Sequence, residues 1–107
     1  MNQTSPSCRE RDPQDLREHA DAATRQLKAL ANVNRLMILC ILSEGELSVG
    51  QLNEMIDLSQ SALSQHLAKL RADELVDTRR ESQTIYYSLR EGVAKNIIGA
   101  LHDYYCA

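Results

Sequence analysis

Three cysteine thiols are the most reactive side chains in this sequence, and their spacing limits what they can do. Cys8, Cys40 and Cys106 are odd in number and lie far apart. They form neither a disulfide framework nor a CxxC zinc motif. In a reducing compartment all three begin as thiols. The chemistry left to them is that of single or paired thiols.

The surroundings of Cys40 and Cys106 leave two interpretations open. Cys40 lies within the apolar run "RLMILCILSEG", where a cysteine is most often an inert small hydrophobe. Cys106 ends the last predicted helix, whose C-terminal partial charge disfavours a thiolate. His102 precedes Cys106 by four residues on the same helical face, and it favours the thiolate when protonated. The residues alone are compatible with inert thiols and with a reactive pair.

A second group of chemically useful side chains lies in the stretch "LSQSALSQHLAKLRADELV", residues 58–76. At about 100° per residue, Leu63, Leu67 and Leu70 share one side of a predicted helix. The other side carries short, uncharged side chains: Gln60, Ser61, Ser64, Gln65 and Ala68. Hydroxyl and amide groups can reach DNA base edges without the charge of a carboxylate. His66 and Lys69 flank this side, where a phosphate backbone would pass.

Further helices must position this polar face. Residues 1–13 are polar, contain Pro6 and Pro13, and are predicted to be a flexible tail. Apolar residues at helical spacing predict a first helix over residues 14–31. Asn34 is the expected N-cap of a second, apolar helix at the centre of the core, and Gly45 its stop.

A short third helix and a turn come before the polar helix. Ser48 is the expected N-cap of the third helix. Its predicted buried stripe consists of Leu52, Met55 and Ile56. A turn over residues 57–59 leads to the polar helix, which begins at Ser59 or Gln60 and reaches about residue 73.

A hairpin and a last helix complete the predicted fold. The runs "LVDTRR" and "TIYYSL" have strand character, "ESQ" reads as the turn between them, and a helix follows over residues 91–105. Four basic or polar residues near the hairpin tip suit contact with phosphates or a minor groove: Arg79, Arg80, Gln83 and Thr84. The prediction is a mainly α winged helix-turn-helix (α-α-α-α-β-β-α) over residues 14–107.

Length and composition exclude several classes of protein. A chain of 107 residues is expected to form one domain. Its net charge of −3 argues against coating nucleic acid but permits a local basic patch. No apolar run has membrane-spanning length and no apolar signal core begins the chain, so we expect a cytosolic protein with no membrane partner. There is no Gly-rich phosphate loop and no redox CxxC motif, so no enzyme and no cofactor are predicted.

Each DNA-binding feature has an ordinary structural alternative. A polar helix face is usually a solvated face, and an Arg pair in a hairpin usually keeps a sheet edge soluble. A winged helix that only contacts other proteins is a further alternative. The complete order of helix, turn, helix and hairpin is hard to assemble by chance, so the sequence predicts binding of double-stranded DNA.

The quoted segments also resemble a known family. "LANVNRL", "ELSVGQL", "LSQSALSQHLAKLR", "LVDTRR" and "YYSL" are similar to motifs of the arsenic-repressor-type (ArsR) winged-helix regulators, and the similarity covers residues 27–106. The resemblance implies a homodimer built from the first and last helices. Such a dimer binds an operator with an inverted repeat and releases it when an effector arrives.

The metal-site motifs of this family are absent from the sequence. In "ELSVG", Ser48 and Gly50 stand where the thiolates of one family site would be. The last helix offers only His102 and Asp103 for a second site, and adjacent helical residues point in different directions. No metal site is therefore predicted there.

Cys40 and Cys106 remain as the candidate effector site. Their arrangement resembles the persulfide-responsive branch of the family, the SqrR-like and BigR-like repressors with HlyU-like relatives. This implies that persulfides or polysulfides link the two cysteines through a bridge of two to four sulfurs and lower operator affinity. The same resemblance implies that Cys8 is dispensable. The alternative is a repressor that uses the same cysteines, with or without His102, to sense a thiophilic metal, or that senses general oxidants through them.

Overall fold

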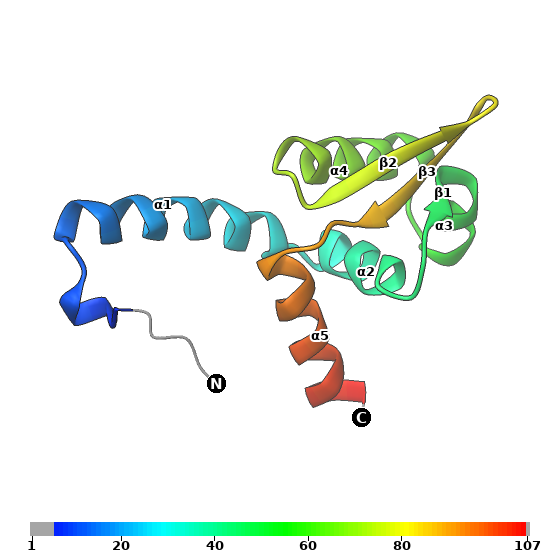
Figure 1. Cartoon of the computed structure of the whole chain (residues 1–107). Coiled ribbons are helices and arrows are strands. Elements are labelled where there is room, and N and C mark those ends of the chain that lie inside the picture. Colours follow the sequence, from blue (N-terminus) through cyan, green and yellow to red (C-terminus); the bar gives the residue numbers. More distant parts are fainter. Residues whose placement is uncertain (1–5, 107) are drawn as a thin grey trace.

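A computed structural model describes residues 6–106 of the chain. Figure 1 shows its elements in chain order: η1 (Cys8–Glu10), α1 (Pro13–Leu30), α2 (Val33–Leu42), β1 (Leu47–Ser48), α3 (Val49–Met55), α4 (Gln60–Ala72), β2 (Val76–Glu81), β3 (Thr84–Leu89) and α5 (Val93–Cys106). The predicted order of four helices, a hairpin and a last helix is confirmed. The sequence did not predict β1, because two residues are too few for a strand pattern.

The predicted tail overlaps a short ordered element. Residues 1–5 lie outside the described residues. Cys8–Glu10 form one turn of 3₁₀-helix, and the Ser7 backbone N–H donates to Glu10 Oε1 at 3.0 Å. Helix α1 begins at Pro13, where the Asp12 side chain accepts a hydrogen bond from the Asp15 N–H.

The junction between α1 and α2 corrects one prediction. The N-cap of α2 is Asn32, not Asn34: Asn32 Oδ1 accepts from the backbone N–H groups of Asn34 and Arg35 at 3.0 and 3.1 Å. Asn34 already lies in the first helical turn. Arg35 fixes the junction from the other side, because its Nε donates to the Ala29 carbonyl at the end of α1 at 2.7 Å.

Helix α3 has the predicted cap but a narrower buried stripe. The Ser48 hydroxyl accepts from the Gln51 N–H, and Gln51 accepts in return from the Ser48 N–H. Leu52 and Ile56 are buried as predicted, whereas Met55 is 59% exposed. The prediction for Met55 is wrong because α3 is only two turns long and buries one edge against α4.

The sheet joins segments that are distant in sequence. Its strand order is β1–β3–β2, and both pairings are antiparallel. The core lies between this sheet and α2, α3, α4 and α5. Helix α2 is only half in the core: Ile38, Leu39 and Leu42 are buried, but Val33 and Met37 are exposed. The expectation that α2 lies at the centre of the core therefore holds for one of its faces.

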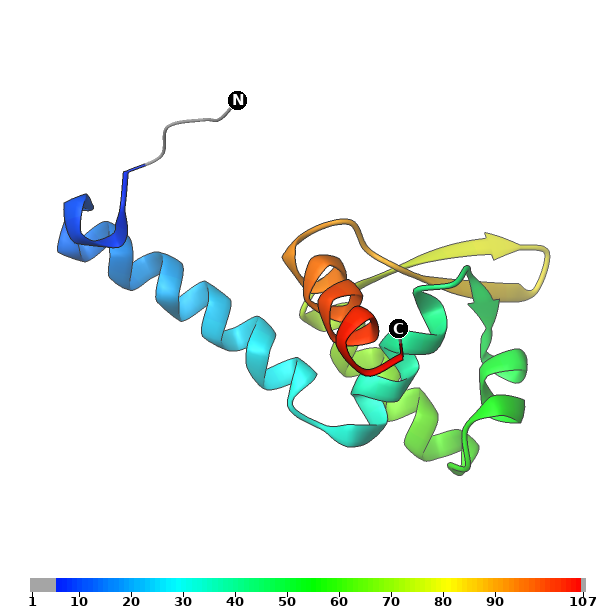
Figure 2. The ribbon, with the colours of Figure 1, turned by 90° about the horizontal axis from the view of Figure 1, so that it is seen from below.

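Helix α1 extends away from the rest of the molecule. Figures 1 and 2 show it projecting from the body formed by the other helices and the sheet. Only Ala29 and Leu30, at its C-terminal end, are buried. Between residues 6 and 106 no helix combines the length and apolar character needed to cross a membrane.

Candidate nucleic-acid interface and cysteine site

The polar face of α4 is exposed along its length. Leu63, Leu67 and Leu70 are buried, as the helical spacing predicts. Five of the predicted DNA-binding residues are exposed on α4: Gln60, Ser61, Ser64, Gln65 and Lys69. His66 is half-buried at the edge of this face. The fold thus presents hydroxyl and amide groups on one surface of a helix that is held by leucines on the other.

The turn before α4 is fixed by local hydrogen bonds. Asn53 of α3 donates from Nδ2 to the Leu58 carbonyl at 2.8 Å. The Ser59 hydroxyl then accepts from the Ala62 N–H at 3.1 Å and caps α4. These bonds set the angle between α3 and α4, as a helix-turn-helix requires.

Lys69 has a carboxylate close by. Its Nζ lies 3.3 Å from Asp73 Oδ2, and the Asp73 side chain is only 10% exposed. The Lys69 ammonium is therefore shared between this ion pair and any phosphate that approaches α4.

The two arginines of the hairpin lie on opposite faces of the sheet. Arg80 is exposed and has no ion pair among residues 6–106. Gln83 and Thr84 are exposed beside it at the tip, where Ser82 turns the chain with a φ of 59°. Arg79, by contrast, already has partners.

Two carboxylates and one ring surround Arg79. Its Nη2 lies 2.6 Å from Glu46 Oε1, its Nη1 lies 3.0 Å from Glu81 Oε1, and its Cζ lies 4.7 Å from the centre of the Tyr86 ring. The hydrogen bonds from Arg79 hold the pKa of the Glu46 carboxyl below its ordinary value, and those with Glu46 and Glu81 raise the pKa of Arg79.

Sequence reasoning missed one basic residue near the polar face of α4. Arg71 is exposed and lines a hollow of about 500 Å³ between α4 and β3, together with Ser64, Ala68, Ala72 and Tyr87. Arg71 follows Ser64 by seven residues, which is two helical turns, so the helical spacing contained the signal.

The structure brings the two candidate sensing cysteines together. Cys40 of α2 and Cys106 of α5 line one hollow of about 450 Å³, which we call the cysteine hollow; its other lining residues are Leu36, Ile41, Glu44, Leu101, His102 and Tyr105. Cys40 is half-buried and Cys106 is exposed, and both are free thiols, as is Cys8. Cys8 lies in η1 and does not line the cysteine hollow.

Burial distinguishes the chemistry of Cys40. Its partly buried position raises the pKa of the Cys40 thiol, and the nearby Cys106 raises it further. In the part of the chain that is described, no three His, Cys, Asp or Glu side chains converge as metal ligands. The hollow therefore offers a half-buried thiol, an exposed thiol and a mostly apolar wall.

Comparison with known proteins defines the class. The family described as "Bacterial regulatory protein, arsR family" matches residues 32–78, which span α2, α3 and α4 and reach into β2. The chain is 52% identical over 93 residues to the "Transcriptional activator HlyU" of Vibrio cholerae, covering 87% of this chain and 86% of that protein. The chain belongs to the arsR family, and it is a DNA-binding transcriptional regulator rather than an enzyme.

Solved structures of related proteins superpose on this chain. Reduced HlyU from Vibrio cholerae superposes with a TM-score of 0.83 at 51% identity, covering 88% of this chain and 99% of that one. The transcriptional repressor BigR from Xylella fastidiosa gives a TM-score of 0.77 at 39% identity, with coverage of 91% and 99%. A homodimeric winged helix-turn-helix DNA-binding domain from Mycobacterium bovis gives 0.76 at 26% identity, with coverage of 88% and 86%. The winged-helix fold predicted from the sequence is confirmed.

Proposed function

We propose that this regulator is a homodimeric repressor that releases its operator when reactive sulfur species link Cys40 to Cys106. The observation that carries the proposal is that the two cysteines, 66 positions apart (106 − 40), line the same hollow between α2 and α5. The relatives HlyU and BigR, which are named as regulators of transcription, support the DNA-binding half of the proposal.

The exposed face of α4 would enter the major groove of the operator. Gln60, Ser61, Ser64 and Gln65 are the proposed contacts to bases, because their side chains are exposed and can donate and accept hydrogen bonds. His66 and Lys69 are proposed to lie along the phosphate backbone at the edge of this face.

The β2–β3 hairpin, which we call the wing, and the end of α4 would add phosphate contacts. Arg80, Gln83 and Thr84 are exposed at the hairpin, and Arg71 faces the hollow between α4 and β3. Replacing Arg71 or Arg80 with Gln should weaken binding to all sequences alike. Each change should reduce the slope of log K against log salt concentration by about 0.9. An unchanged slope would remove that residue from the proposed contacts.

Exposed apolar residues favour a dimer through α1 and α5. Leu27 of α1 is exposed, and so are Val93, Tyr104 and Tyr105 of α5. Paired across a two-fold axis, these helices would hide these side chains from water and present two α4 helices to an inverted repeat. The homodimeric relative from Mycobacterium bovis supports this arrangement.

The proposed chemistry uses a persulfide such as glutathione persulfide as both sulfur donor and oxidant. The exposed Cys106 thiolate takes the outer sulfur of one persulfide and releases glutathione. The new Cys106 persulfide attacks the carbon-bound sulfur of a second glutathione persulfide and expels hydrogen sulfide. Cys40 then attacks the central sulfur and expels glutathione. In sum, two thiols and two persulfides give one trisulfide, two glutathiones and one hydrogen sulfide.

The bridge would act on DNA through α5. It ties α2 to α5, and α5 belongs to the proposed dimer interface, so the tie would change the angle between the two α4 helices. A coupling free energy of about 1–3 kcal/mol corresponds to a roughly 5–150-fold change in affinity. A longer sulfur chain spans a wider gap than a disulfide, which needs Cα atoms within about 7 Å. This difference could make the response selective for persulfides over peroxide.

Intact mass spectrometry tests the proposal directly. The wild type and Cys8→Ser are treated anaerobically with glutathione persulfide, with oxidised glutathione or with peroxide. We expect a gain of sulfur and a loss of two hydrogens with persulfide alone, and peptide mapping should place the link between Cys40 and Cys106. The same product with every oxidant would indicate a general redox sensor. No link, together with tight binding of zinc or arsenite, would indicate a thiophilic-metal sensor using Cys40, Cys106 and His102.

A further inference from the structure

Arg79 lies on the face of the wing that is turned away from α4. In the register of the sheet, Arg79 is opposite Tyr86, and Tyr86 is opposite Ser48 of β1. Tyr87, the next residue, points to the other face and lines the hollow beside α4. Arg79 therefore shares its face with Tyr86, away from α4.

We propose that Arg79 and Glu46 form a clamp that positions the wing, and that Arg79 does not contact DNA. The guanidinium donates to Glu46 through Nε, at 3.1 Å to Oε1 and 3.2 Å to Oε2, and through Nη2, at 2.6 Å to Oε1. A third nitrogen, Nη1, is taken by Glu81, and the Tyr86 ring covers the group. A phosphate would have to displace two carboxylates to bind it.

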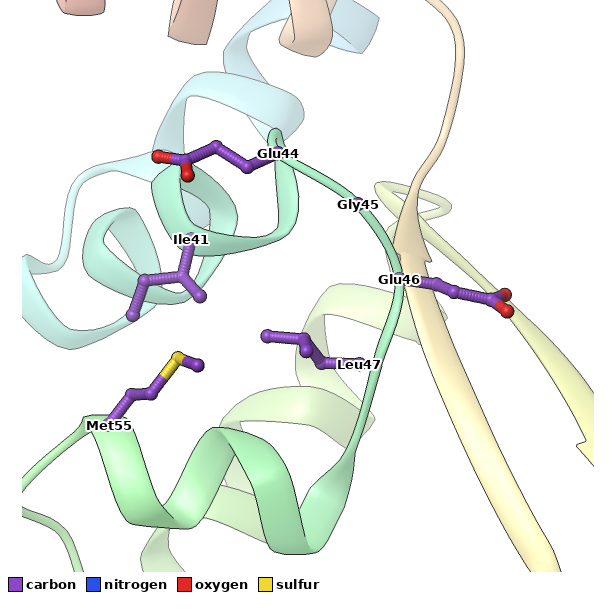
Figure 3. A pocket seen from close by; sticks show the side chains of 6 residues that line it. All are labelled: Ile41, Glu44, Gly45, Glu46, Leu47 and Met55. Atoms are coloured by element: carbon purple, nitrogen blue, oxygen red, sulfur yellow. The ribbon is translucent and has the colours of Figure 1, made fainter.

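Glu46 belongs to the segment that follows α2, so the clamp joins two parts of the fold. Figure 3 shows Glu46 pointing away from the hollow formed by Ile41, Leu47 and Met55, whereas Glu44 points in another direction. The backbone pairing between this segment and the wing is short, because β1 pairs with β3 over only two residues. A bidentate side-chain contact across 33 sequence positions therefore adds a second tie between α2 and the wing.

The clamp makes a prediction opposite to that of simple electrostatics. If Glu46 only repelled DNA, then Glu46→Gln would tighten operator binding, because it removes a negative charge and frees an arginine. If Glu46 holds the wing in place, the same change leaves the hairpin less ordered and weakens binding. The inference rests on the proposed phosphate contacts of the wing. The Arg80→Gln variant tests those contacts separately.

The experiment measures operator affinity across a salt series for Glu46→Gln, Arg79→Gln and the double variant. The matched controls are Glu44→Gln, which removes a neighbouring charge outside the clamp, and Arg80→Gln. We expect each clamp variant to bind about two- to fivefold more weakly with an unchanged salt slope, which is the range of an exposed ion pair. The double variant should bind no more weakly than either single one. Amide hydrogen exchange should become faster at residues 80–84 in the clamp variants.

Other results separate the clamp from the proposed function. Tighter or unchanged binding by Glu46→Gln, or a salt slope lowered by about 0.9 in Arg79→Gln, would overturn the clamp. If Arg80→Gln alters neither affinity nor slope, the proposed phosphate contact of the wing fails, whatever the clamp variants do. Thermal unfolding of each variant checks that the fold is retained, and unchanged hydrogen exchange in a folded Glu46→Gln protein would also overturn the clamp.

Discussion

At the scale of the residue, the two proposed sensing thiols are not equivalent. Cys106 is exposed at the end of α5, whereas Cys40 is half-buried in α2. Burial and, to a lesser degree, Cys106 raise the pKa of Cys40. Because the thiolate is the nucleophile, Cys106 is suited to react first with an incoming persulfide and Cys40 to close the bridge.

This asymmetry predicts the pH dependence of Cys40 alkylation. In Cys8→Ser, the rate of Cys40 modification by iodoacetamide should rise with pH and reach its midpoint above the ordinary cysteine range, because only the thiolate reacts. Adding Cys106→Ser should lower that midpoint by removing a neighbouring negative charge, while the larger effect of burial remains. Mass spectrometry of the Cys40 peptide gives the rates. A Cys40 midpoint at or below that of a free cysteine peptide would contradict this assignment.

Single residues also show where sequence reasoning ends. The helical period placed Leu63, Leu67 and Leu70 in the core and exposed the polar face of α4. It could not separate Arg79 from Arg80, because the partner of Arg79 is Glu46, which is 33 positions away and meets it only in the folded sheet. The shared hollow of Cys40 and Cys106 was expected from family resemblance, since no local pattern links α2 to α5.

At the scale of the element, the capping residues determine where each helix begins. Ser48 could be predicted as a cap because it immediately precedes a helical pattern. Ser59, predicted as a possible first residue of the polar helix, is the N-cap of α4. Asn32 and Asn34 are equally good cap residues, so the sequence alone could not choose between them. The choice depends on the turn that joins α1 to α2, which Arg35 fixes by binding the Ala29 carbonyl.

The corrected cap can be tested with a matched pair of variants. Asn32→Ala should lower the free energy of unfolding by about 1 kcal/mol, because two backbone N–H groups lose their acceptor. Asn34→Ala should change it by less than about 0.5 kcal/mol, because its side chain caps nothing. Urea denaturation measures both values. A larger loss of stability for Asn34→Ala would indicate that Asn34, not Asn32, caps α2.

The end of α4 contains a conformation that suits glycine. Glu74 has a φ of 61°. The Leu75 N–H donates to the Leu70 carbonyl and the Glu74 N–H to the Arg71 carbonyl, which is the Schellman motif of helix C-termini. Glu74→Gly should raise the free energy of unfolding by about 1 kcal/mol, since a side chain in this region is strained. The exposed ion pair with Arg90 is worth little. Glu74→Ala is the control and should bring no such gain; equal denaturation midpoints for the two variants would contradict the explanation.

At the scale of the whole molecule, the projecting α1 and the exposed side of α5 form the proposed dimer interface. Leu27→Glu should weaken the dimer about a hundredfold or more, because each copy would bury a charge in place of a leucine. Met55→Glu is a matched control: Met55 is 59% exposed and Leu27 51%, but Met55 lies on α3, outside the proposed interface. Sedimentation equilibrium measures the dimer dissociation constant of both variants. Equal dissociation of the two variants would remove α1 from the interface.

The central claim joins these scales: a bridge between two thiols must change the affinity of the dimer for DNA. The most direct measurement is fluorescence anisotropy of an operator duplex with wild type, Cys8→Ser, Cys40→Ser and Cys106→Ser, before and after anaerobic glutathione persulfide. We predict a loss of affinity of roughly 5–150-fold for wild type and Cys8→Ser. The Cys40→Ser and Cys106→Ser proteins should bind equally well before and after treatment. Release of the operator from Cys40→Ser by persulfide would contradict the account.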